Sequence, residues 1–295
     1  MKKTINKTAE ATEMKLFAGE KLLVILSLIG FALAAGIALY ISLYGSVILP
    51  EGDVERAFSF NAAIAMFILS IAAILPISGL SSSKRKSIRW FFIPATLYAY
   101  GIETIQHFRG FNPRFSRAGS IIDNVAGILF GIDSLLIIVV TALFAIPFFR
   151  RKRPHERPLV VLGIRYAFVS TMVAFAAGLW MIVEQGRYTG AAGNLIVLHG
   201  LGFHALQALP FLGWLLERAR SDVQRARRMI HTGSIVWSIS ILLVGLQTAL
   251  GRTVFEWTPL PLLAGAALIV WLAAFVIAGL ELLRSTKVSE TPNPL

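Results

Sequence analysis

Eight long apolar segments run along the chain, and this feature most constrains what it can fold into. Each segment holds about 20 or more residues, the length that an α-helix needs to cross the hydrocarbon core of a bilayer. The sequence therefore predicts an all-α, polytopic membrane protein with eight transmembrane helices. The predicted spans cover residues 22–48, 58–80, 88–107, 121–149, 159–184, 194–217, 229–251 and 259–284.

The composition agrees with a membrane protein and narrows its chemistry. Of the 295 residues, 56% are hydrophobic and 15% are charged, whereas about 25% of the residues in a soluble domain are charged. Cysteine is absent, which excludes disulfides, thiolate metal ligands and a catalytic thiol. A net charge of +12 would suggest nucleic acid for a soluble protein. Here the basic residues flank apolar segments, so we expect the lipid bilayer as partner and no nucleic acid.

Lysine and arginine are divided unevenly between the two sides of this topology. One side receives 22 of the 28 basic residues, in the tails 1–21 and 285–295, at the ends of spans, and in loops such as 150–158. The basic side of a multi-pass protein faces the cytoplasm. We therefore predict a plasma-membrane protein with both termini cytoplasmic, which requires an even number of spans. The opposite side receives the remaining six: Arg56, Arg109, Arg114, Arg117, Arg187 and Arg252.

Short motifs recur in the same order in residues 22–149 and 159–284. Parallel repeats related by an axis along the membrane normal are a known plan for membrane proteins. The recurrence predicts two four-helix bundles related by a 4+4 internal repeat, with Glu103 equivalent to Gln247. The matched motifs are LAAGI (33–37) with FAAGL (175–179), LPISGL (75–80) with LPFLGW (209–214), and GIET (101–104) with GLQT (245–248).

An eight-helix chain of this length, built as two four-helix bundles, is similar in outline to heme A synthase. That family carries a histidine pair in each half and cysteines in an outer loop. This chain has no cysteine, and its first half has only His107 within a span. The resemblance therefore implies an architecture and assigns no residues.

Polar and ionisable residues gather in the outer half of the third to seventh spans. Such residues are expensive within a membrane and mark functional sites by default. They predict a polar pocket, open to the extracytoplasmic side, that binds or moves a small anionic or amphipathic ligand. The predicted ligand-binding residues are Glu103, His107, Arg109, Arg114, Asp133, His199, His204, Gln207, Gln247 and Arg252.

Three arginines lie between the third and fourth spans, against the usual charge bias: Arg109, Arg114 and Arg117. The planar guanidinium group binds phosphate and carboxylate groups in a bidentate manner, so these residues suggest an anion. The alternative is that they pair with acids of this protein, such as Glu103, Asp123 and Glu184, or bind headgroups of the outer leaflet.

The segment HGLGFHALQALP (199–210) is the most distinctive in the chain. His199 and His204 are five residues apart, about 140° around a helix, so one metal ion cannot easily bind both. Gly200 and Gly202 allow another helix or a flat ligand to approach. Asp133 and His204 lie at similar depths, which suggests a buried pair that is either a structural hydrogen bond or part of a proton relay.

Two other functions stay open at this point. One is a membrane oxidoreductase or heme-handling protein, with heme as cofactor and His107, His199 and His204 as candidate ligands, since imidazole is a usual axial ligand. The other is a structural accessory subunit whose polar residues hold its helices together. Catalytic residues and oligomeric state are not predicted, because no serine, phosphate-binding or coiled-coil motif stands out.

Overall fold

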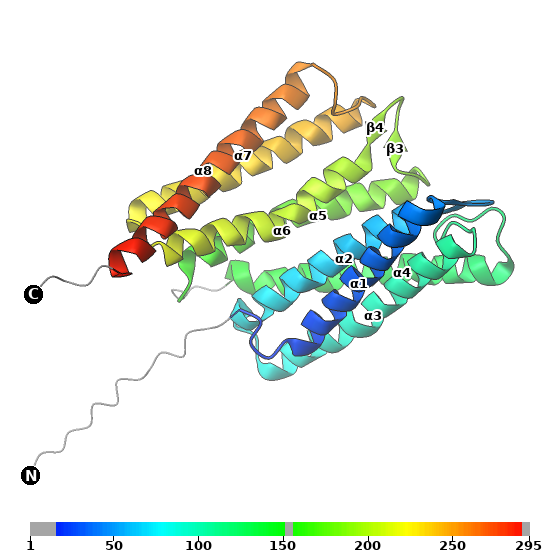
Figure 1. The fold of residues 1–295 in the computed structure, drawn as a ribbon, viewed down its shortest axis with the longest axis horizontal. Helices are drawn as coiled ribbons and strands as arrows, with labels where there is room; N and C mark the ends of the chain where they lie inside the picture. Colours follow the sequence, from blue (N-terminus) through cyan, green and yellow to red (C-terminus); the bar gives the residue numbers. More distant parts are fainter. Residues whose placement is uncertain (1–15, 151–155, 291–295) are drawn as a thin grey trace, which may run out of the picture.

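The computed structural model describes residues 16–150 and 156–290, which fold into long helices and two short β-hairpins (Figure 1). Parts of the predicted cytoplasmic segments 1–21, 150–158 and 285–295 lie outside the described residues. The first half holds α1 (Lys21–Tyr44), β1 (Val47–Ile48), β2 (Gly52–Asp53), α2 (Val54–Ile74), the 3-10 helix η1 (Leu75–Ser78), α3 (Ser82–Phe108) and α4 (Ile121–Arg150). The second half holds α5 (Pro158–Val183), β3 (Tyr188–Thr189), β4 (Gly193–Asn194), α6 (Leu195–Arg218), α7 (Val223–Ala249) and α8 (Pro259–Glu290).

Seven of the described helices are long and apolar enough to cross a membrane. The predicted class, an all-α multi-pass membrane protein, is therefore supported. The exception is α3, which is 27 residues long but begins with a basic turn (84–89) and ends with Glu103 and His107. The eighth span therefore remains a prediction.

Two helix ends differ from the predicted ends because a capping side chain or a glycine sets where the helix begins or ends. The helix α7 begins at Val223 rather than at residue 229, because the carboxylate of Asp222 accepts the Arg225 N–H (2.9 Å) and caps the first turn. The helix α1 ends at Tyr44 rather than at residue 48, since Gly45 adopts φ +84° and leads into the first hairpin.

Figure 1 shows α1 to α4 grouped on one side of the molecule and α5 to α8 on the other. The helices α5 and α6 approach so closely that a side chain would not fit at three glycines. A Cβ atom at Gly163, Gly202 or Gly213 would lie within 3 Å of atoms of the facing helix. Gly202 therefore has the close-approach role that the sequence suggests, whereas a Cβ atom at Gly200 would meet no atom within 4 Å among the described residues.

The two groups of helices share one hydrophobic core. The rings of Phe67 on α2 and Phe203 on α6 lie 5.6 Å apart in a T-shaped arrangement. Nearby, the Gln207 amide on α6 donates to the Ser70 hydroxyl on α2 (2.6 Å). A polar and an aromatic contact thus join the halves along α2 and α6.

The end of the bundle that holds the start of α1 is fastened by a buried acid. The side chain of Glu20 is fully buried and lies 2.6 Å from the Arg85 guanidinium and 2.8 Å from that of Arg89. These contacts tie α1 to the basic start of α3. Because Glu20 falls in the predicted tail 1–21, the sequence gives no sign of this role.

Candidate functional site

Two β-hairpins lie at the other end of the bundle, away from the start of α1 and the end of α8 (Figure 1). The first hairpin leads into α2 and the second into α6. A polar side chain caps each helix: Asp53 accepts the Glu55 N–H, and Asn194 accepts the Ile196 N–H. The charge distribution predicts that this end is extracytoplasmic, and it is named the outer end below.

One backbone hydrogen bond fastens each hairpin to the end of another helix. The Glu51 N–H donates to the Gly110 carbonyl after α3 (2.8 Å), and the Ala192 N–H donates to the Gly251 carbonyl after α7 (2.8 Å). Both glycines have a positive φ, a conformation that other residues rarely adopt. The outer end therefore contains two similar hairpin–helix arrangements, named the first and second junctions.

In the first junction, a buried carboxylate is neutralised by an arginine of the following loop. Glu103 on α3 is 1% exposed, and its Oε2 lies 2.9 Å from Nη2 of Arg114. The Arg114 guanidinium also lies 5.3 Å and 5.0 Å from the ring centroids of Phe60 and Phe130, within cation–π range. Two of the predicted ligand-binding residues are therefore paired with each other.

A second acid neutralises another arginine of this loop. The Asp123 carboxylate at the start of α4 accepts hydrogen bonds from Arg109, from the Gln106 amide (3.0 Å) and from the Ser120 hydroxyl (2.7 Å). Arg109 and Arg114 thus pair with acids of the protein, as the alternative interpretation expects. Glu184 instead accepts a hydrogen bond from the indole of Trp180 (2.9 Å).

Both ring nitrogens of His107 face groups of the protein. The Asp53 N–H donates to Nδ1 (3.1 Å), and Nε2 lies 3.4 Å from Oε1 of Glu103. A nitrogen that accepts a hydrogen bond carries no proton, so we assign the proton of the neutral ring to Nε2. His107 therefore links the first hairpin to the Glu103–Arg114 pair, with Nδ1 hydrogen-bonded to the hairpin and Nε2 buried beside Glu103.

The two histidines of α6 occupy different surroundings. Nδ1 of His199 donates to the Ala174 carbonyl on α5 (2.7 Å), because a carbonyl can only accept. His204 is exposed, and its Nδ1 lies 3.4 Å from the Gln207 amide oxygen. Within the described residues, Asp133 makes no hydrogen bond or ion pair, and its Oδ2 is buried without a partner. The structure thus does not form the expected Asp133–His204 pair.

Gln247 and Arg252 belong to the second junction. The buried Gln247 amide donates to the Thr253 carbonyl (2.9 Å), and the Arg252 guanidinium lies 2.6 Å from the Glu256 carboxylate. By its backbone hydrogen bonds, Gln247 holds the position in the second junction that Gln106, rather than Glu103, holds in the first. The Phe111 N–H donates to the Gln106 carbonyl (2.8 Å) as the Arg252 N–H donates to the Gln247 carbonyl (3.2 Å).

A pocket of about 410 Å³ opens at the outer end between the two halves. None of the ten predicted ligand-binding residues lines it. Its walls come from the first hairpin, from the loop after α3 and from the end of α5. We name it the outer pocket; its lining residues are Glu51, Asn112, Phe115, Ser116, Arg117 and Gln185.

The Glu51 carboxylate shapes the wall of the outer pocket. It accepts hydrogen bonds from the Ser116 hydroxyl (2.6 Å) and from the N–H groups of Arg117 (2.8 Å) and Ala118 (3.1 Å). The Ser116 bond, aided by the backbone bonds and opposed by burial, lowers the pKa of the Glu51 carboxyl below its usual value. Glu51 thereby holds the loop in place around Arg117.

The sequence contains weak signals for this pocket. Asn112 precedes a proline, and its side chain accepts the N–H groups of Arg114 (3.0 Å) and Phe115 (3.2 Å), which turns the loop. Arg117 is one of the three arginines that suggest an anion, yet it is not among the predicted ligand-binding residues. Glu51 and Gln185 have no such motif, because only the fold brings them together.

Among the described residues, no group of three or more histidine, aspartate or glutamate side chains could hold a metal ion. Comparison with protein-family models, curated proteins and solved structures gives no match. The likeness to heme A synthase therefore remains one of outline, and the functional argument rests on the site itself.

Proposed function

We propose that the chain is an eight-span plasma-membrane protein, with both termini cytoplasmic, that binds a small anionic or amphipathic molecule in the outer pocket. The start of α1 and the end of α8 lie at the same end of the bundle (Figure 1), which agrees with an even number of spans. This proposal includes α3 as a span, since α3 runs beside α2 and α4.

The observation that carries the proposal is the state of Arg117. Arg56, Arg109, Arg114 and Arg252 each form an ion pair with a carboxylate. Arg117 is exposed and lines the outer pocket, and its guanidinium has no side-chain partner in the described part of the chain. An exposed, unpaired guanidinium is a ready partner for a carboxylate or phosphate.

The other pocket walls fit an amphipathic anion. Phe115 provides an aromatic surface, while the amides of Asn112 and Gln185 provide hydrogen-bond donors. The Glu51 carboxylate is already hydrogen-bonded to the loop. Glu103, Arg114, Arg109 and Asp123 support this loop in the proposal and do not contact the ligand.

The test measures the thermal stability of the purified chain with inorganic phosphate, citrate and decanoate, and with choline as a cationic control. We expect at least one anion to raise the melting temperature of the wild type and to lose this effect in Arg117→Gln. Arg187→Gln is the matched control, because Arg187 is an exposed arginine of the outer end that does not line the pocket. An unchanged shift in Arg117→Gln would contradict the proposal.

A structural accessory role is the second candidate. It is favoured by the pairing of Arg109, Arg114 and Arg252 with acids of the protein itself. Under this alternative, none of the probe anions stabilises the chain through Arg117, so the same experiment separates the two functions.

A further inference from the structure

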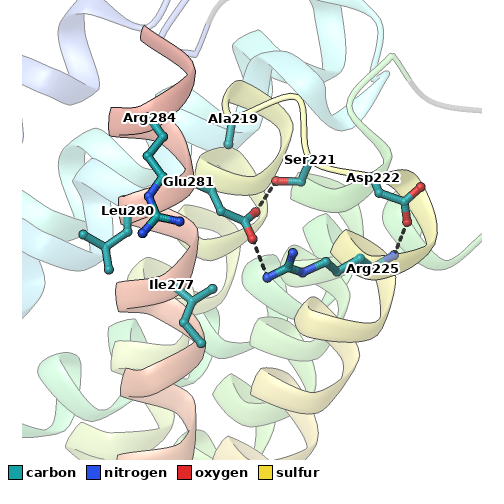
Figure 2. A pocket seen from close by; sticks show the side chains of 8 residues that line it. All are labelled: Ala219, Ser221, Asp222, Arg225, Ile277, Leu280, Glu281 and Arg284. Atoms are coloured by element: carbon teal, nitrogen blue, oxygen red, sulfur yellow. Dashed lines mark hydrogen bonds and ion pairs between the residues drawn. The ribbon is translucent and has the colours of Figure 1, made fainter. Parts of the chain in front are cut away.

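A second pocket, of about 440 Å³, lies at the opposite end of the molecule, between the α6–α7 turn and α8. Figure 2 shows Ser221 and Arg225 on one side of it, with the side chains of Ile277, Leu280, Glu281 and Arg284 projecting from α8 on the other. We name it the inner groove. It shares no residue with the outer pocket.

The α8 wall of the inner groove changes from apolar to basic along the helix. Ile277 and Leu280 are 42% and 48% exposed, and Arg284, further along the same face, is also exposed. Ile277 and Arg284 are seven residues apart, which corresponds to about 10 Å along the helix axis. The apolar end therefore lies deeper in the bundle, and the basic end lies at its rim (Figure 2).

Both arginine side chains of the inner groove are exposed to solvent. The Arg225 guanidinium lies 2.8 Å from the Glu281 carboxylate, yet 63% of its side chain is exposed. The Ser221 hydroxyl donates to the other Glu281 oxygen (2.6 Å), which fixes this carboxylate between the two elements. Arg284 has no side-chain partner within the described residues. One arginine is thus positioned and the other is free.

The groove itself is lined by two acids, Asp222 and Glu281, which already accept hydrogen bonds from the protein, and by two arginines; the positive charge that favours a negative occupant comes from the residues around it. Three further arginines of the α6–α7 turn and the start of α7 are exposed near this end: Arg220, Arg227 and Arg228. The bundle end with most of the basic residues is predicted to face the cytoplasmic leaflet. Anionic lipids are attracted to basic segments there, and basic pockets between transmembrane helices bind their headgroups.

We propose that the inner groove binds one anionic phospholipid, with its phosphate at Arg284 and Arg225 and an acyl chain along Ile277 and Leu280. The polarity of the groove runs in the direction of the lipid, from headgroup at the rim to chain in the bilayer. A free phosphate would contact the arginines alone, whereas a phospholipid held by its headgroup would also place an acyl chain along Ile277 and Leu280. The lipid accounts for both ends of the groove.

The test uses the full chain, purified in detergent and titrated with phosphatidylglycerol, with phosphatidylcholine as the neutral lipid. Native mass spectrometry counts the lipids retained, and the melting temperature reports stabilisation. We expect Arg284→Gln to bind phosphatidylglycerol about tenfold more weakly, because a charge-assisted hydrogen bond is lost. Arg218→Gln is the matched control, since Arg218 is an exposed arginine of the same end that does not line the groove.

Two further measurements decide the identity of the occupant. Leu280→Ala should weaken retention of phosphatidylglycerol while the variant stays folded, since Leu280 is half exposed. Inorganic phosphate alone should shift the melting temperature of the wild type and of Arg284→Gln by the same amount. Equal losses in Arg218→Gln and Arg284→Gln, equal retention of both lipids, or full protection by phosphate that Arg284→Gln abolishes would each overturn the proposal. Arg117→Gln should leave lipid retention unchanged, so this result is independent of the outer pocket.

Discussion

The two junctions of the outer end have similar backbones and different chemistry. In each, a capped helix follows a two-stranded hairpin, and a positive-φ glycine accepts the hydrogen bond of the hairpin turn. The first junction adds the Glu103–Arg114 pair, the Asp123–Arg109 pair and His107. The second is held by Asn194 and Gln247, with one exposed ion pair, Arg252–Glu256.

The comparison shows that the charges are not needed for the backbone arrangement itself. The second junction forms the same hairpin without a buried carboxylate–arginine pair. In the first junction, the charged residues extend into the loop that follows α3 and fix its path past Glu51. The additional charges therefore hold the loop 109–120, which carries Arg117 to the wall of the outer pocket.

The largest expected effect concerns the side of the membrane on which the junctions lie. Because the chain has no cysteine, single cysteines can be introduced without removing a native one. We expect Ala118→Cys and Ala191→Cys to react with an impermeant maleimide added to intact cells, and Ser83→Cys to react only after permeabilisation. All three residues are exposed. If the two junctions were labelled from opposite sides of the membrane, they would not lie at the same end of the bundle, and the eight-span topology would be wrong.

The second prediction removes the acid of the buried pair. Glu103→Ala removes a buried carboxylate and leaves Arg114 between Phe60 and Phe130 without its partner; we expect a loss of about 2 kcal/mol in stability, less than for a fully buried pair because the Arg114 side chain is 37% exposed. In the second junction, Glu256→Ala removes the partner of a half-exposed arginine and should cost about 0.5 kcal/mol. Thermal unfolding in detergent measures both.

A double variant sharpens this result. Glu103→Gln combined with Arg114→Gln removes both charges, so it should be less destabilised than Glu103→Gln alone, which leaves Arg114 without a carboxylate. Equal destabilisation of the double and single variants would show that Glu103 acts through packing rather than through charge.

The third prediction exchanges the helix caps. Asp53→Asn gives the first junction the cap residue of the second and should change stability little, whereas Asp53→Ala should cost about 1 kcal/mol. Asn194→Ala should cost a similar amount at the second junction. A large loss in Asp53→Asn would mean that the Asp53 charge matters, through its contact with Arg56 (3.0 Å).

The smallest expected effect is a pH dependence of the melting temperature, and it arises from Glu51 in the first junction. The folded-state pKa of Glu51 lies below the usual glutamate value of about 4.5, mainly because of the Ser116 hydrogen bond, so the stabilisation from ionised Glu51 is present above pH 4.5. It is lost as the pH falls through the folded-state pKa. The melting-temperature difference between wild type and Glu51→Gln should therefore shrink below pH 4.5. A difference that stays constant with pH would contradict this assignment.

The sequence predicts the long helices well because membrane burial requires long apolar runs. It does not predict the hairpins, since Val47, Ile48 and Leu49 extend the apolar run of α1 and hide its end at Tyr44. Four hydrogen bonds from the loop 109–120 to the Glu51 carboxylate are likewise invisible in the sequence, because this loop and the first hairpin meet only in the fold.

The sequence predicts a polar pocket in the outer half of the helices, but none of the predicted ligand-binding residues lines the outer pocket. Depth in the membrane locates a side chain along a helix but not around it. Asp133 and His204 lie at similar depths and still make no contact in the described structure. The 4+4 repeat remains a prediction: the junctions resemble each other, but the bonds pair Gln247 with Gln106, whereas the motifs pair it with Glu103.

The glycine contacts between α5 and α6 have a mechanical consequence. Gly163 and Gly213 bring the backbones of these two helices together, so neither can slide past the other without a clash. If the chain is pulled from its C-terminal end by an atomic force microscope tip, α7 and α8 should leave the bilayer before α5 and α6. The α5–α6 pair should then come out in one step at a higher force. Replacing Gly213 with alanine should lower that force.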